Sequence, residues 1–159
     1  MIRRATSDDY DWIRVTAAEV YRDFGDYGSI ILSWIHHPGV LTFLDTADEG
    51  GERRGFILLG FYEPDDVNPG AYVADLLAIA VGPTHQGTGV GRRLLEFACD
   101  LASSAGERVA VPEIRLTVAD TNDRARRLFE KNGFEILDAK HGAYDGGQRA
   151  IRMMRKLRK

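Results

Sequence analysis

The chain has 159 residues, of which 44% are hydrophobic and 28% charged, a composition typical of one globular domain with its own core. Its net charge of −3 offers no overall positive field for nucleic acid, and no apolar run reaches the roughly 20 residues of a membrane-spanning helix. The single cysteine excludes an internal disulfide. We therefore expect one domain over residues 1–159, located in the cytoplasm, with neither nucleic acid nor membrane among its partners.

The first half of the chain predicts a strand, a helix, an ambiguous segment and three further strands. Ser7 and the two aspartates after it offer good N-caps for the helix. The ambiguous residues 21–39 place isoleucines and a tryptophan at helical spacing before Pro38-Gly39 ends the pattern. The last two strands are almost continuously apolar, which is typical of strands covered on both faces. The predicted ranges are strand 2–6, helix 7–20, strand 40–44, strand 55–62, loop 63–70 and strand 71–81.

The second half alternates helices and strands. One helix follows the turn after residue 81 and continues to about Ala102, and a second ends at Gly133, a typical C′ residue. The strand–helix–strand unit in the middle is a crossover, which joins parallel strands. We therefore expect an α/β or α+β domain with one mixed sheet. The remaining predicted ranges are strand 113–118, a helix within 122–134, and strands 134–137 and 150–157.

A glycine-rich turn, QGTGVG at residues 86–91, separates the strand 71–81 from the next helix. The first turn of a helix has unpaired N–H groups and a partial positive charge, which together attract phosphate. Glycines let the main chain approach such an anion closely. Arg92 and Arg93 add charge at the start of the helix. The turn therefore predicts a phosphate or pyrophosphate site, with a plain strand-to-helix turn as the alternative.

Two familiar phosphate motifs do not fit this turn, which disfavours ATP- and NAD-dependent chemistry. The P-loop needs lysine where Arg92 stands, and the dinucleotide fingerprint needs a third glycine where Arg92 or Leu94 stands. The turn instead fits [QR]-x-x-G-x-[GA], and it resembles the acetyl-CoA-binding motif of the GNAT superfamily of N-acetyltransferases. VADTNDRARRLFEKNGFEIL (118–137) resembles the downstream V-x-x-x-N-x-x-A-x-x-[LF]-[YF]-x-x-x-G-F region of that family.

The resemblance implies a GNAT fold, in which a single, mostly antiparallel mixed sheet has a central, splayed pair of parallel strands and is flanked by helices. It implies acetyl-CoA as cosubstrate, CoA as product and no metal. The phosphates would bind the amides of the turn, and the pantetheine arm would pair with the edge of the preceding strand. The cofactor-binding residues so implied are Ile79, Ala80, Val81, Gln86, Gly87, Thr88, Gly89, Val90, Gly91, Arg92, Asn122 and Phe129. Asn122 also suits a helix N-cap.

The resemblance also suggests which residues carry the chemistry. An attacking amine must be neutral, so it needs a base. Asp75 lies among apolar neighbours, where its pKa should rise, at a position similar to the general base of some family members; Glu113 is the reserve candidate. Phe129 stands where the family often has a tyrosine that protonates the leaving thiolate. Tyr144 is the alternative hydroxyl, in a segment similar to the hairpin of protein N-terminal acetyltransferases.

The acceptor should lie opposite the cofactor, between residues 21–39 and 138–149. The first of these segments carries aromatic and acidic side chains: Tyr21, Asp23, Asp26, Tyr27 and Trp34. A helix pair with core aromatics is the simpler reading of it, and His36-His37 lacks the spaced partners of a metal site. We expect direct acetyl transfer to a primary amine of a small molecule, protein or peptide, with a homodimer left open. The alternative is a non-catalytic acyl-CoA-binding regulatory domain.

Overall fold

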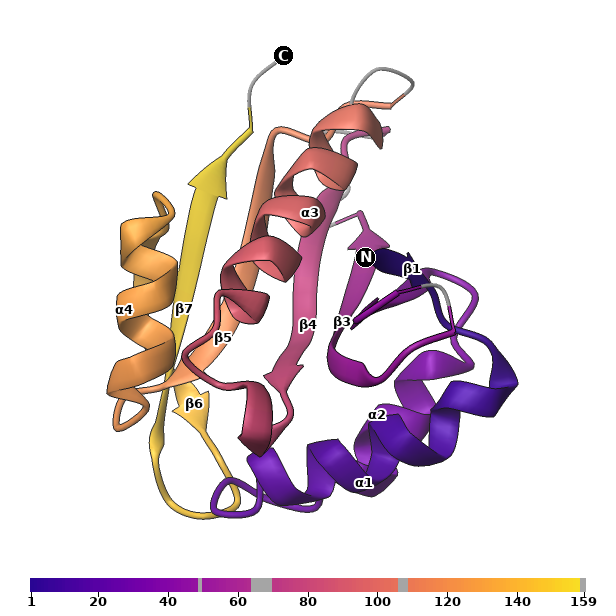
Figure 1. Ribbon diagram of the computed structural model, residues 1–159. Coiled ribbons are helices and arrows are strands. Elements are labelled where there is room, and N and C mark those ends of the chain that lie inside the picture. Colours follow the sequence, from indigo (N-terminus) through magenta and orange to yellow (C-terminus); the bar gives the residue numbers. More distant parts are fainter. Residues whose placement is uncertain (49, 64–69, 106–108, 158–159) are drawn as a thin grey trace.

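The computed structural model describes residues 1–48, 50–63, 70–105 and 109–157. Within them, seven strands form one sheet in the order β1-β2-β3-β4-β5-β7-β6 (Figure 1). Every neighbouring pair is antiparallel except β4 and β5, which are parallel. This confirms the mixed, mostly antiparallel sheet. The strands are β1 (Ile2–Arg4), β2 (Val40–Thr46), β3 (Arg53–Tyr62), β4 (Val73–Val81), β5 (Glu113–Ala119), β6 (Glu135–Ala143) and β7 (Arg149–Lys156).

Helices cover both faces of the sheet. They are α1 (Tyr10–Val20), α2 (Tyr27–Ile35), α3 (Val90–Ala105) and α4 (Asp123–Lys131). Alternate residues of β3 divide between the two layers, because successive side chains of a strand point to opposite faces. Ile57 and Leu59 pack in the cluster that contains α3, and Phe56 and Leu58 pack in the cluster that contains α1 and α2. The continuous apolar pattern of this strand thus correctly predicted burial on both faces.

The parallel pair at the centre of the sheet separates part way along. β4 and β5 pair only from Ala74 opposite Ile114 to Leu76 opposite Leu116. Beyond that point β4 continues along β3, and β5 continues along β7. The register between β3 and β4 shifts at Leu77, and an extra residue of this kind bends a strand away from its partner. The splayed pair that the family resemblance implied is therefore confirmed.

The largest difference from the predicted elements lies in the last hairpin. β6 extends over Glu135–Ala143, whereas the sequence predicted a strand only over 134–137. Gly142 lies inside β6 with a φ of +129°. The ambiguous segment 21–39 contains α2, and the single cysteine, Cys99, is buried on α3. The predicted loop 63–70 lies, except for its two end residues, outside the described residues.

None of the helices in the described ranges combines the length and the apolar character that crossing a bilayer requires.

Candidate active site

A cavity of about 910 Å³ opens where β4 and β5 separate. Its volume is in the upper part of the range typical of small-molecule sites, about 300–1,000 Å³. The glycine turn forms one part of its lining, and the α1–α2 segment and the β6–β7 hairpin, which contact each other, form another. Most of the predicted site residues line this cavity: Asp75, Ile79, Ala80, Val81, Gln86, Gly87, Gly89, Gly91, Arg92, Asn122, Phe129 and Tyr144.

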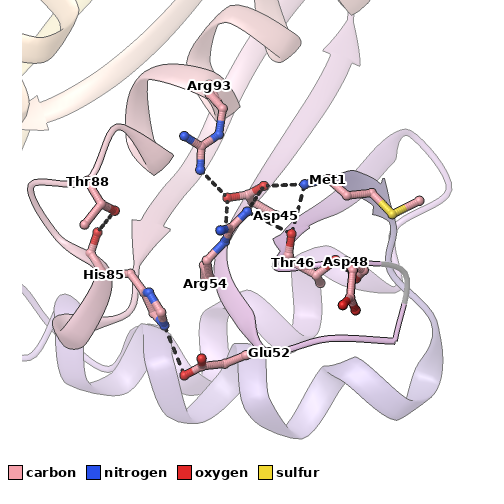
Figure 2. Close-up of polar contacts among 9 residues, drawn as sticks. All are labelled: Met1, Asp45, Thr46, Asp48, Glu52, Arg54, His85, Thr88 and Arg93. Carbon is pink, nitrogen blue, oxygen red and sulfur yellow. Dashed lines mark hydrogen bonds and ion pairs between the residues drawn. The ribbon is translucent and has the colours of Figure 1, made fainter.

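The side chains of two predicted residues point elsewhere. Val90 is buried in the core beneath the turn. The hydroxyl of Thr88 donates a hydrogen bond to the carbonyl oxygen of His85 (Figure 2). The sequence analysis assigned cofactor binding to every residue of the turn. For Thr88 and Val90, only the main-chain groups are therefore suited to that role.

The turn has the backbone geometry that its glycines suggested. Gly87 and Gly89 have φ values of +80° and +87°, in the left-handed region that favours glycine. α3 begins at the next residue, Val90, so its unpaired N–H groups lie at the end of the cavity. This is the combination of free donors and helix dipole that binds anions.

The two arginines after the turn have different surroundings. Arg92 lines the cavity, and its Nε lies 2.9 Å from a carboxylate oxygen of Glu96 on the next turn of α3. Arg93 reaches back beneath the turn and donates to Asp45, with 3.0 Å between Nη2 and Oδ2 (Figure 2). Arg93 therefore anchors α3 to β2, and of the two only Arg92 lies along the cavity.

Asp45 is fully buried and collects several cationic partners (Figure 2). Its carboxylate contacts Arg93, the guanidinium of Arg54 at 3.2 Å and the amino group of Met1 at 3.3 Å. Burial alone would raise the pKa of Asp45, but these hydrogen bonds more than offset it and lower the pKa below its ordinary value. Through Arg93, this cluster holds the start of α3 against β2, the strand that carries Asp45.

Arg124 is a residue of this site that sequence reasoning missed. It follows the N-cap of α4, lines the cavity, and donates from Nη1 to Oε1 of Gln86 at 2.9 Å. Its other terminal nitrogen lies 3.7 Å from where a Cβ of Gly87 would be. The sequence held no signal for this contact, because α4 and the turn meet only in the fold.

Side chains hydrogen-bond to the edge of β4 beyond the splay. The hydroxyl of Tyr21 donates to the carbonyl of Ile79 at 2.7 Å and accepts from the N–H of Ile79 at 3.1 Å. The side-chain amide of Gln86 donates to the carbonyl of Val81 at 3.2 Å. The edge predicted to pair with pantetheine is thus exposed to the cavity and occupied at Ile79 by a hydroxyl.

Asp75 lies on β4 at the base of the cavity, with 16% of its side chain exposed. Burial raises its pKa, although Arg152, whose Nη2 lies 3.5 Å from Oδ2, opposes the rise. The raised pKa agrees with the prediction for a carboxylate among apolar neighbours. The reserve candidate, Glu113, pairs with Arg115 at 2.8 Å and is not among the residues that line the cavity.

Asn122 is the N-cap of α4, and Phe129 lies within this helix. The side chain of Asn122 accepts from the amide of Ala125 at 3.3 Å, so it caps this helix as well as lining the cavity. Phe129 is 3% exposed and packs against Phe134. It places a ring, without a hydroxyl, in the wall beside the splayed strands.

Aromatic side chains form the opposite end of the cavity. Tyr144 packs against Phe24 and Tyr27, with ring centroids 5.4 and 6.3 Å apart, and burial raises its pKa, so its hydroxyl stays protonated. Tyr21 stacks on Tyr27 at 4.8 Å. The predicted aromatics therefore line a cavity rather than forming only core. Other lining residues here are Asp23, Ile30, Trp34, His141 and Asp145.

Three other predicted residues of this region have structural contacts. Asp26 accepts from the amide of Ser29 and caps α2. His36 packs edge-on against Tyr10, and His37 accepts from the amide of Gly39. The described residues hold no group of three or more potential metal ligands.

A family model described as "Acetyltransferase (GNAT) family" matches residues 5–134. N-alpha-acetyltransferase 40 of Saccharomyces cerevisiae is 44% identical over 62 residues, which cover 37% of this chain and 22% of that protein. Mycothiol acetyltransferase of Beutenbergia cavernae is 36% identical over 76 residues, which cover 48% of this chain and 24% of that protein. The chain thus spans less than a quarter of the length of these curated relatives.

Solved structures share the fold over nearly the whole chain. Arabidopsis thaliana NAA60, in complex with a bisubstrate analogue, has a TM-score of 0.78 and 13% identity, covering 99% of this chain and 97% of that one. YncA of Salmonella typhimurium, solved with acetyl-CoA, has a TM-score of 0.75 and 22% identity, covering 100% and 94%. At these identities the likeness shows the fold alone.

Proposed function

The chain belongs to the GNAT family of acetyltransferases, and on that basis we propose that it transfers the acetyl group of acetyl-CoA directly to a primary amine. The observation that carries the proposal is the continuity of one cavity, which contains the glycine turn, the open edge of β4 and Asp75. Cofactor-binding groups and a candidate base thus share one space, as direct transfer requires.

The residues at the turn suit the phosphates of CoA. Free N–H groups between Gln86 and Gly91 and the start of α3 would hold the pyrophosphate, with Arg92 and Arg124 adding positive charge. The peptide groups of Ile79 and Val81 would pair with the amides of the pantetheine arm. Ala80, Asn122 and Phe129 would line its path toward Asp75.

Asp75 would act as the general base. In its charged form it accepts the proton of the amine, directly or through a water molecule, while the nitrogen bonds to the thioester carbon. The carbon–sulfur bond then breaks and CoA leaves as a thiolate. A thiol pKa near 8.5 makes this a tolerable leaving group, so the absence of a hydroxyl at Phe129 does not forbid turnover. Tyr144 would supply a protonated hydroxyl at the acceptor end.

The proposed acceptor is an amine, either of a small molecule or of a protein or peptide. The two curated relatives are named for both kinds, an N-alpha-acetyltransferase and a mycothiol acetyltransferase. Acidic residues at the aromatic end, Asp23 and Asp145, suit an acceptor that arrives as a cation. The single buried cysteine fits a reducing compartment such as the cytoplasm.

The test is amine-dependent release of CoA. The protein is incubated with acetyl-CoA and a panel of amines, peptides and amino acids, with free thiol measured by absorbance and products by mass spectrometry. We expect thiol release and an acetylated product for at least one acceptor. Tight CoA binding without release for any acceptor would favour the alternative, a non-catalytic acyl-CoA-binding domain. Light scattering on the same sample shows whether the protein is a homodimer.

A further inference from the structure

The splay leaves Ile79 without a β5 partner on the cavity side, yet its peptide groups are not free. The Tyr21 hydroxyl, 58 residues away in sequence, donates to the Ile79 carbonyl and accepts from the Ile79 N–H, at 2.7 and 3.1 Å. Strand pairs here end at Leu76 and Leu116. One side chain therefore satisfies both groups of an edge residue that a neighbouring strand would otherwise pair.

A phenol hydroxyl reproduces what an amide offers to a strand edge, since it carries one donor and one acceptor site. Tyr21 follows α1, and its ring stacks on Tyr27 at a centroid distance of 4.8 Å. Burial raises its pKa, so the hydroxyl keeps the proton that it donates. The arrangement is thus held by packing as well as by hydrogen bonds.

We propose that Tyr21 is an internal competitor of the cofactor: its hydroxyl occupies the Ile79 peptide in the free protein, and an amide of the pantetheine arm displaces it. This rests on the proposed function, because it takes β4 as the strand that pairs with pantetheine. The N–H and the carbonyl of Ile79 are each already bonded to Tyr21, so the arm cannot form both bonds until the hydroxyl leaves.

Displacement of Tyr21 would also change the aromatic part of the cavity, where we propose that the acceptor binds. The ring that must move is stacked on Tyr27, and Tyr27 in turn lies 6.3 Å from Tyr144. Cofactor binding would therefore change the aromatic wall that faces the acceptor, through the stacked rings and before the acceptor itself binds.

The test compares CoA binding to the wild-type protein and to Tyr21→Phe by isothermal titration calorimetry. This variant keeps the stacked ring and removes only the competing hydroxyl. We expect it to bind CoA about three- to tenfold more tightly, the size of one or two net hydrogen bonds. Adenosine 3′,5′-bisphosphate, which has phosphates but no pantetheine arm, should bind both proteins equally. Tyr10→Phe, at the start of α1 and outside the cavity lining, is the matched control and should bind CoA like the wild type.

The results of these titrations distinguish a failure of the Tyr21 displacement from a failure of the proposed function. Equal or weaker CoA binding by Tyr21→Phe, or an equal gain with adenosine 3′,5′-bisphosphate, overturns the displacement alone. Absence of CoA binding to the wild-type protein overturns the proposed function and the displacement with it. If the variant does not fold, nuclear magnetic resonance on the wild type decides: the nuclear Overhauser effect between the Tyr21 ring and the Ile79 amide should vanish at saturating CoA. Its persistence overturns the displacement.

Discussion

At the scale of single residues, Asp75 combines two opposed influences. Its burial raises its pKa, while Arg152 lies 3.5 Å away and favours the charged form. Arg152 also donates to the hydroxyl of Tyr62 at 2.7 Å, so its guanidinium is held in place from a second side. Asp75 is therefore a carboxylate in a fixed position whose proton affinity is higher than that of an exposed aspartate.

Asp75→Asn should lower kcat about 100-fold, the smaller end of what a positioned base contributes, and leave CoA affinity unchanged. Because the pKa of Asp75 is raised above 3.8, wild-type kcat/KM should increase with pH as this group loses its proton. The variant should lack that acidic limb. The measurement is a pH–rate profile, with Asp100→Asn on the exposed face of α3 as control. A wild-type profile in Asp75→Asn would remove Asp75 as the base.

Arg124 is a second single residue with a testable role, because its proposed part in CoA binding depends on its position beside Gln86. Arg124→Ala should weaken CoA binding about tenfold, since it removes a charged donor beside Gln86 and Gly87. Arg127→Ala removes an equal charge from the same helix outside the cavity lining and should have little effect. Calorimetric titration with CoA measures both. Equal losses in the two variants would show that only the net charge of α4 matters.

At the scale of elements, the β6–β7 hairpin and the segment after α1 contact each other beside the aromatic part of the cavity. The side-chain amide of Gln148 donates to the carbonyl of Asp23 at 3.0 Å. A Cβ at Gly146 would overlap that same carbonyl oxygen. The turn of the hairpin therefore fits against the α1–α2 segment only because position 146 has no side chain.

Gly146→Val should force the hairpin away from Asp23 and change how the acceptor is held. We expect KM for the acceptor to rise several-fold, with CoA affinity unchanged because a side chain at position 146 would meet Asp23 and Gln148 rather than the glycine turn. Gln148→Ala, which removes the hydrogen bond without adding bulk, should have a smaller effect in the same direction. Steady-state kinetics with each substrate varied in turn measures both. A loss of CoA affinity equal to the loss for the acceptor would contradict this division.

Elements and contacts differed in how well the sequence predicted them. Strands β3 and β4 and the glycine turn were found because hydrophobic runs and glycine spacing are local signals. The length of β6 was missed because it is exposed along its whole length and has no apolar alternation to mark it. Arg124 and Tyr21 were missed as partners of Gln86 and Ile79 because side-chain contacts between distant segments leave no trace in spacing.

At the scale of the whole molecule, Asp45 ties distant parts of the chain together. It lies on β2 and bonds to Met1 before β1, Arg54 on β3 and Arg93 on α3. Since its pKa is lowered in the folded protein, the stabilisation is complete above the unfolded value of 3.8 and is lost as the pH falls through the folded value.

Asp45→Asn should therefore lower the free energy of unfolding by about 2 kcal/mol at pH 7, because charged hydrogen bonds are lost and three cations lose their counter-charge. The difference from the wild type should shrink as the pH falls below 3.8, first because the unfolded wild-type chain takes up a proton at Asp45, and then because the folded carboxylate does so at its lowered pKa. Urea unfolding at several pH values measures both effects. A difference that stays constant down to pH 2 would show that packing, rather than charge, accounts for it.

The two ends of the cavity are encoded in separate stretches of sequence. Residues 86–92 and 124 form one end, and residues 20–34 and 141–145 form the other. Because these stretches do not overlap, we expect that grafting two short segments from another member of the fold, with Tyr21 retained, would alter the choice of acceptor and leave the glycine turn unchanged. A chimera built in this way should keep the cofactor of the parent protein and accept a different substrate. Exchange of such segments is a simple way for one fold to acquire new substrates.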